Sequence, residues 1–158
     1  MDEDYRYTQA NLDDAAAISR LISSVVEEFV IPDFSPRGAK NMRAIISEQA
    51  IRGYIEQGID YHLATFSSQI IGVLAIKQRT HIYHFFVDKS HQKKKVAYNL
   101  WRRWQAIDPQ PRITVSSSKF AMAFYHSLGF KQHQPKVDIN DIVSYPMLRE
   151  REIEGVKE

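Results

Sequence analysis

The sequence predicts an α/β fold of the α+β type, in which a mixed, mostly antiparallel sheet of about six to seven strands carries helices on both faces. Short aromatic and β-branched runs alternate along the chain with apolar residues at helical spacing. Three strand-like runs follow one another directly, which favours antiparallel pairing, whereas a helix separates 81–88 from 112–117, which favours a parallel βαβ unit. The length suggests a single domain over 1–158 that ends in a charged tail at 149–158.

The N-terminal third of the chain is predicted to form one strand followed by helices. Residues 5–10 are rich in tyrosine and threonine, as strands are. Asn11 can cap the next helix, whose apolar residues recur at helical spacing as far as Phe29. Two prolines then interrupt the pattern, and a second helical stretch covers 35–58. The residues at 47–49 can restart that stretch as a separate helix.

The rest of the chain is predicted to supply most of the strands of the sheet. Residues 61–66 and 69–78 predict a hairpin, and 81–88 predicts a third strand that is apolar on both faces near its end, as a central strand is. A helix is predicted to begin near Gln92 and to present an apolar face up to Ile107. The closing elements are a strand at 112–117, a helix at 119–130 that Gly129 caps, and a pair of strands at 130–137 and 142–148.

The composition is that of a soluble globular protein, with 44% hydrophobic and 25% charged residues. The formal net charge of +2 gives no global reason to expect a nucleic-acid or membrane partner. The chain has no cysteine, which excludes disulfides and thiolate metal sites and fits a reducing compartment. No apolar run approaches the roughly 18 residues that a membrane span needs, and the acidic N-terminus lacks a signal peptide's apolar core. We therefore expect a cytoplasmic protein.

Three consecutive lysines, Lys93, Lys94 and Lys95, stand where the predicted helix begins. Cations at a helix N-terminus oppose the helix dipole, so they are unfavourable there unless an anion is bound. The unpaired amides of a first helical turn bind phosphate groups, and lysines beside them would strengthen that binding. The alternative is that the lysines form a solvated turn with no ligand.

The segments "HIYHFFVDKSHQKKKVAYNLW" and "ITVSSSKFAMAFYHSLGFK" resemble the GNAT-type N-acetyltransferases. The family's first motif is Gln or Arg, two variable residues, Gly, one variable residue, then Gly or Ala. It maps without gaps onto Gln92, Lys93, Lys94, Lys95, Val96 and Ala97. The second motif is a helix reading Ala-x-x-Phe-Tyr-x-x-Leu-Gly-Phe, and its fixed places match Ala121, Phe124, Tyr125, Leu128, Gly129 and Phe130.

This resemblance implies an enzyme that transfers the acetyl group of acetyl-CoA to a primary amine by direct attack, with coenzyme A as product. The acceptor is a small-molecule or peptide amine that the motifs do not identify, and homodimers are common in the family. The resemblance places the pyrophosphate on residues 92–97 and the pantetheine arm along the strand that contains Phe86 and Val87. Ser116 stands where the family often has an asparagine that contacts the cofactor.

Lys95 departs from the first motif because the family has glycine there. Glycine lets the backbone approach a phosphate and adopt a positive φ without strain. A lysine must either keep ordinary dihedral angles or accept a strain of about 1–2 kcal/mol. Its ammonium group can compensate by pairing with the phosphates. The departure keeps open a non-catalytic acyl-CoA-binding or sensor domain of the same fold.

Tyr125 is the predicted general acid, because a tyrosine can give its proton to the departing thiolate and the family's tyrosine at this place has that role. The alternative is a core tyrosine packed beside Phe124. The general base is open between Glu28 and His84. His81 and His84 are expected on opposite faces of their strand, so no metal site is predicted from them. A nucleic-acid-binding module built on the lysine run is a further alternative, although no nucleic-acid-binding motif supports it.

Overall fold

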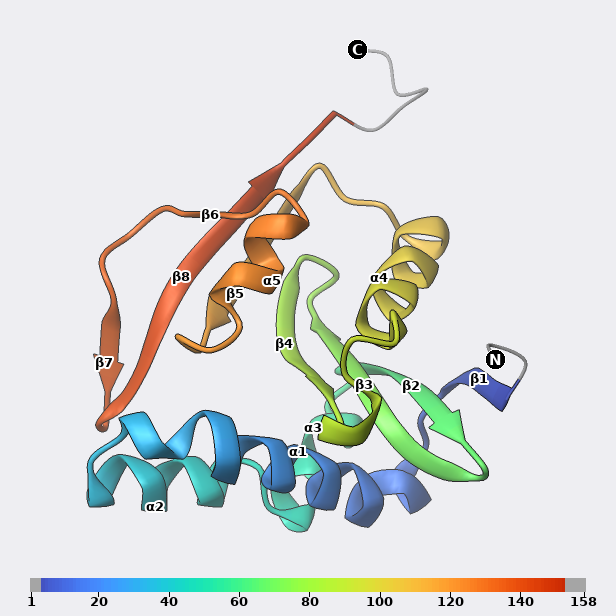
Figure 1. The fold of residues 1–158 in the computed structure, drawn as a ribbon, viewed down its shortest axis with the longest axis horizontal. Coiled ribbons are helices and arrows are strands. Elements are labelled where there is room, and N and C mark those ends of the chain that lie inside the picture. The colour runs from blue at the N-terminus through green and yellow to red at the C-terminus, as the bar shows by residue number, and fades with distance from the viewer. Residues whose placement is uncertain (1–3, 153–158) are drawn as a thin grey trace.

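The computed structural model of the protein describes residues 4–152 (Figure 1). Its strands are β1 Tyr5–Gln9, β2 Asp60–Phe66, β3 Gln69–Lys77, β4 His81–Val87, β5 Arg112–Ser117, β6 Lys131–Gln132, β7 Val137–Ile139 and β8 Ile142–Glu150. Its helices are α1 Ala15–Phe29, α2 Pro36–Ile45, α3 Glu48–Glu56, α4 Val96–Ile107 and α5 Met122–Ser127. Short 3-10 turns, η2 Leu12–Asp14, η3 Ile31–Asp33 and η4 Lys89–His91, connect them.

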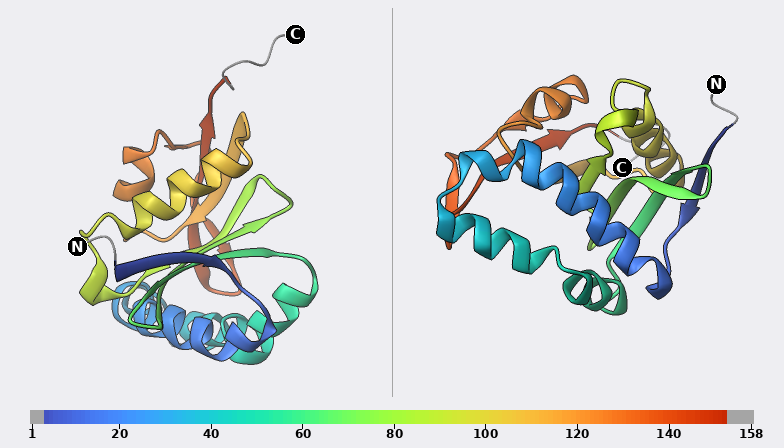
Figure 2. Two further views of the ribbon diagram at one scale, coloured as in Figure 1. Left: turned by 90° about the vertical axis from the view of Figure 1, so that its right-hand side faces the viewer. Right: turned by 60° about the horizontal axis from the view of Figure 1, so that its bottom comes forward.

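The strands form one mixed sheet in the order β1-β2-β3-β4-β5-β8-β6, with β7 paired to β8. All pairs within the described residues are antiparallel except β4 with β5, which is the predicted parallel unit. Helices α1 to α3 cover one face, and α4 lies on the other (Figure 2). The predicted fold class is therefore confirmed.

The sheet separates two hydrophobic clusters, so its central strands are apolar on both faces. Adjacent residues of β3 belong to different clusters: Leu74 packs with Trp104 beneath α4, and Val73 packs with Ile22 beneath α1. Side chains that alternate along a strand fill both layers in this way. The two clusters together hold β4, the strand that leads into the candidate site, from both sides.

A bulge in β4 opens the sheet. Ala75 pairs with His84 and the next residue pairs with Ile82, so Tyr83 is the extra residue in β4. The parallel pairing with β5 covers only His81–Thr114 and Ile82–Val115. Beyond Ile82 the two strands are no longer paired within the described residues. The strands therefore part at the carboxyl-terminal half of β4, where ligands bind in open sheets with parallel strands.

The bulge corrects the expectation that His81 and His84 lie on opposite faces. His81 Nδ1 lies 2.8 Å from Thr114 Oγ1, on the face away from the cluster under α4, and His84 contacts Tyr61 on that same face. The extra residue shifts the alternation by one, which a strict two-residue period cannot anticipate. No group of three or more metal-ligating side chains forms within residues 4–152.

Three predicted boundaries also need correction. Helix α4 begins at Val96 rather than near Gln92, because the preceding residues form turns. The strand expected at 130–137 divides into the short β6 and β7. The tail expected from residue 149 begins later, because Arg149 and Glu150 pair with β5 at the end of β8. The remainder of that tail, 153–158, lies outside the described residues.

The tip of the β7–β8 hairpin lies against the start of α2 (Figure 1). Asn41 Nδ2 donates to the carbonyl of Asn140 at 2.8 Å, and Ser35 Oγ lies 3.2 Å from Asp141 Oδ2. Gly38 permits this approach, since a Cβ there would lie 2.1 Å from the carbonyl oxygen of Asp141. The hairpin and α2 thus form a continuous wall. Among the helices described, none combines the length and apolar character that crossing a bilayer requires.

Candidate active site

Two cavities adjoin where β4 and β5 part. The first, the loop groove, has a volume of about 440 Å³ and lies between the end of β4, the start of α4 and the segment before α5. The second, the inner cavity, has a volume of about 430 Å³ and lies between β4, β5, α2 and the β7–β8 hairpin. Phe85 and Ala121 line both cavities. The arrangement therefore offers two contiguous compartments for two reactants.

The floor of the loop groove is the turn between β4 and α4. Gln92 Nε2 donates to the carbonyl of Val87 at 3.0 Å and ties the turn to the end of β4. Val96 is buried against Gly72, where an added Cβ would lie 3.1 Å from Val96 Cγ1. This close packing fixes the N-terminus of α4. Its first-turn amides have no partner within the helix and can receive an anion.

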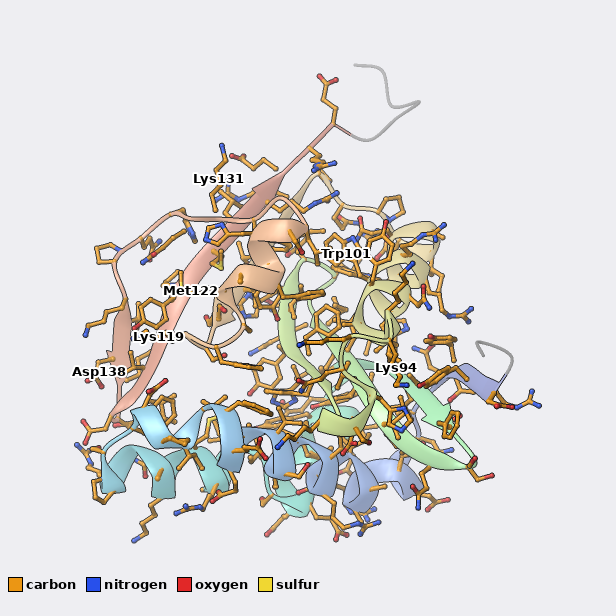
Figure 3. The ribbon with its side chains drawn as sticks, in the orientation of Figure 1. Lys94, Trp101, Lys119, Met122, Lys131 and Asp138 are labelled. Carbon is orange, nitrogen blue, oxygen red and sulfur yellow. The ribbon has the colours of Figure 1, made fainter. Side chains whose placement is uncertain are left out.

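The lysine run supplies positive charge beside these amides. Lys93 and Lys95 line the loop groove, and Lys94 is exposed on the same turn (Figure 3). Within residues 4–152, none of the three forms an ion pair with a carboxylate. Three exposed, unpaired cations at the positive end of a helix repel one another and the dipole, so the turn is electrostatically complementary to an anion.

Lys95 takes the backbone conformation that the resemblance assigns to glycine. Its φ is 63°, in the left-handed region, and its carbonyl accepts the α4 hydrogen bond from Asn99 N at 2.9 Å. Lys93 also has a positive φ, of 65°. A left-handed conformation costs a residue with a side chain about 1–2 kcal/mol. The turn therefore keeps a backbone geometry suited to glycine and adds two charges.

Tyr125 projects from α5 into the inner cavity and is buried, with 4% of its surface exposed. Its ring packs against Phe85 and Phe130, at centroid distances of 6.2 and 5.4 Å. No group among the described residues makes a hydrogen bond to its hydroxyl. Burial raises the pKa of Tyr125 above its ordinary value, so the hydroxyl keeps its proton at neutral pH. The side chain is a neutral proton donor in the inner cavity, packed against Phe85, which lines both cavities.

His84 lies in the same inner cavity and is buried. Its Nδ1 lies 3.0 Å from the hydroxyl of Tyr61. Burial lowers the pKa of His84 to about 3, because the apolar surroundings disfavour the imidazolium. The ring is therefore neutral at neutral pH and can accept a hydrogen bond.

Glu28 lies elsewhere. Its Oε2 is 2.8 Å from Lys89 Nζ, its side chain is half-exposed, and it lines neither cavity. The adjacent Glu27 is held by Arg43 at 2.7 Å, and the hydrogen bond from Arg43 lowers the pKa of Glu27. Of the two candidate bases, the structure brings only His84 into one cavity with Tyr125.

The cofactor residues expected from the sequence divide between the two cavities. The loop groove is lined by six of them: Val87, Gln92, Lys93, Lys95, Val96 and Ala97. Phe86 and Ser116 line the inner cavity, and Lys94 lines neither. The expected strand segment and the loop therefore line two spaces that adjoin at Phe85 and Ala121.

The sequence did not indicate the role of Phe120. Its side chain is 48% exposed, lines the loop groove and stacks on Phe29 of α1, with the ring centroids 4.4 Å apart. The helix predicted over 119–130 includes Phe120, but α5 begins only at Met122. Its exposure follows from that late helix start, for which the sequence carries no clear signal.

Known proteins share this architecture. A family model described as "Acetyltransferase (GNAT) domain" matches residues 30–151. No curated protein matches the chain. A GCN5-related N-acetyltransferase structure from Rhodopseudomonas palustris superposes with a TM-score of 0.77 at 18% identity, covering 92% of this chain and 95% of that one. The PaiA N-acetyltransferase of Thermoplasma acidophilum, in complex with coenzyme A, superposes with a TM-score of 0.73 at 14% identity, covering 93% of this chain and 99% of that one. An aminoglycoside 6'-N-acetyltransferase complexed with coenzyme A superposes with a TM-score of 0.63 at 12% identity, covering 92% of this chain and 96% of that one.

Proposed function

This chain belongs to the GNAT acetyltransferase family, and from that premise we propose that it transfers the acetyl group of acetyl-CoA to a primary amine. The observation that carries the proposal is the adjoining pair of cavities, one cationic at a helix N-terminus and one containing a protonated tyrosine. Structures of other proteins with this fold contain coenzyme A, which supports the cofactor assignment.

The loop groove suits the cofactor. The amides at the start of α4, with Lys93 and Lys95, would hold the pyrophosphate, because they supply hydrogen-bond donors and unpaired positive charge. The exposed backbone of β4 beyond Ile82 would bind the pantetheine arm, since β5 no longer pairs with it there. Bound acetyl-CoA supplies an activated acyl group as a thioester.

The inner cavity suits the acceptor and the proton transfers. The neutral amine attacks the acyl carbon, a carbon–nitrogen bond forms, and the carbon–sulfur bond breaks. Tyr125 gives its proton to the departing sulfur. The nitrogen loses a proton to water, with His84 as a hydrogen-bond acceptor in the same cavity. Tyr125 then recovers a proton from water, which completes the exchange.

The proposal is tested by calorimetric titration of the protein with acetyl-CoA, followed by an assay for free coenzyme A over a panel of amines. We expect saturable binding and amine-dependent release of coenzyme A. Binding without release on any amine would favour the non-catalytic acyl-CoA-binding domain. Absence of binding would contradict the cofactor assignment itself.

Lys95 offers a separate test of how the groove holds phosphate. We expect Lys95→Met to weaken acetyl-CoA binding by about five- to tenfold, because it removes the charge and keeps the Cβ and the left-handed backbone. Lys95→Gly should weaken binding by a similar factor while it relieves the backbone strain. Calorimetry at two salt concentrations measures both. Tighter binding by the glycine variant alone would show instead that the lysine side chain obstructs the groove.

A further inference from the structure

We propose that the acceptor is a small amine with one positive charge on an apolar, aromatic-sized body, and that the inner cavity rejects diamines and polyamines. This inference rests on the proposed acetyl transfer. The class of acceptor amine follows from the side chains that line the inner cavity.

The wall of the inner cavity is mostly apolar. Aromatic side chains come from Phe34, which directly follows η3, and from β4, and aliphatic side chains come from α2 and the β7–β8 hairpin. The large apolar side chains that line the cavity together with Tyr125 and His84 include Phe34, Met42, Tyr83, Phe85, Phe86 and Ile142. Surfaces of this kind bind aromatic or branched hydrocarbon groups by excluding water from them.

No aspartate, glutamate, lysine or arginine lines the inner cavity in the described part of the chain. Asp33 of η3 and Asp138 of β7 form no ion pair among the described residues, but neither of them lines the inner cavity. Three other carboxylates of the surrounding elements are paired with cations. Glu27 is held by Arg43 at 2.7 Å, and Glu28 by Lys89 at 2.8 Å. Asp141, at the hairpin tip, lies 3.7 Å from Arg37. The cavity therefore has no anionic group ready to receive an ammonium ion.

In such a cavity, an acceptor with two ammonium groups costs more free energy to bury than an acceptor with one. The attacking nitrogen must lose its proton before it reacts, and an apolar environment lowers the pKa of an amine and assists that loss. A second ammonium group elsewhere on the acceptor keeps its charge and must be buried without a partner, which costs several kcal/mol. His84 adds no compensating negative charge, since it is either neutral or cationic. The cavity therefore discriminates between acceptors by the number of positive charges that they carry.

The outer wall closes the inner cavity between α2 and the β7–β8 hairpin. Ile139 and Asn140 of the hairpin line the cavity, and the contact of Asn140 with Asn41 joins the hairpin to α2. The close approach at Gly38 leaves no gap for a side chain between the two elements. A long polyamine therefore cannot extend its second charge to solvent between α2 and the hairpin tip.

A matched pair of amines tests the inference. The two molecules 4-methylbenzylamine and p-xylylenediamine have the same ring, and a methyl group in the first replaces the second aminomethyl group. We expect kcat/KM for the monoamine to exceed that for the diamine by at least about 30-fold, after correction for the two equivalent amino groups. Spermidine should be a poorer acceptor still. Equal or better use of the diamine would overturn the inference.

A substitution in the wall supplies the control. Met42→Glu places a carboxylate in the cavity, and it should raise the diamine-to-monoamine ratio of kcat/KM by about tenfold. Met42→Gln has nearly the same shape without the charge and should keep the wild-type ratio. If the two variants shift the ratio equally, shape rather than charge sets the preference and the inference fails.

Binding measurements separate this inference from the proposed function. Both amines are titrated by calorimetry into the protein alone and into the protein saturated with coenzyme A. Selective binding of the monoamine without acetyl transfer would support the acceptor class and overturn the enzymatic proposal. Transfer restricted to diamines or polyamines would support the enzymatic proposal and overturn the acceptor class. Failure of the monoamine to bind under either condition would also overturn the acceptor class.

Discussion

Replacing Tyr125 by phenylalanine is expected to lower kcat for acetyl transfer by about 100-fold or more and to leave acetyl-CoA affinity unchanged. The variant removes the proton donor of the inner cavity and keeps the ring that packs against Phe85 and Phe130. Since no described group hydrogen-bonds to the hydroxyl, its removal leaves no unpaired polar group in the protein. Steady-state release of coenzyme A measures kcat, and calorimetry measures the affinity.

The matched control is Tyr7→Phe, which removes a hydroxyl from β1. Tyr7 lines neither cavity, and its hydroxyl accepts a hydrogen bond from Asn99 at 3.2 Å. This variant should keep kcat within about twofold of the wild type, since surface changes away from a site have small effects. Equal kcat for Tyr125→Phe and the wild type would remove the general-acid role. A large loss of thermal stability in Tyr125→Phe would show that the hydroxyl is structural.

His84 is expected to make folding stability fall steeply in mild acid. Its pKa is lowered to about 3 in the folded protein by burial and is near 6.5 in the unfolded chain. The unfolded chain therefore binds the proton first, so the stabilisation is complete above about pH 6.5 and is lost progressively as the pH falls toward 3. Between pH 7 and pH 4 the loss from this one residue is about 3 kcal/mol.

Urea unfolding at pH 7 and pH 4 measures the loss, and His84→Asn isolates it. Asparagine can still form a hydrogen bond with the hydroxyl of Tyr61 through its side-chain amide, but it does not titrate. His81, whose pKa is also lowered by burial, is present in both proteins and cancels in the comparison. We expect the wild type to lose more stability than the variant. Equal losses would mean that His84 is protonated in the folded protein at pH 4.

Much of the fold follows from patterns that the sequence displays directly. The apolar periodicity of α1 and of the strands from 61 to 88 placed these elements correctly, because each buries a face against a large core. The βαβ order predicted the parallel pair of β4 with β5. The beginning of α4 was placed too early because two lysines adopt positive φ values that their residue type disfavours.

The site was less predictable than the fold. The first motif named Gln92, Lys93, Lys95, Val96 and Ala97 of the loop groove, since these residues lie in one short segment, but it did not name His91, Tyr98 or Phe120. The inner cavity draws on α2, β4, β5 and the β7–β8 hairpin, so its composition depends on long-range packing that no local pattern records. The bulge at Tyr83 adds to this difficulty, because one extra residue changes which face the neighbouring side chains occupy.

The contact between the hairpin tip and α2 also has a kinetic meaning. Its hydrogen bonds, from Asn41 to Asn140 and between Ser35 and Asp141, join residues 99 and 106 positions apart. Contacts of such separation require the closure of a very long loop, so they form late in folding. They are also few and exposed, which places them among the first to break in a local opening that leaves the sheet intact. This part of the wall is therefore expected to be among the last to form as the chain folds and among the first to lose its contacts as it unfolds.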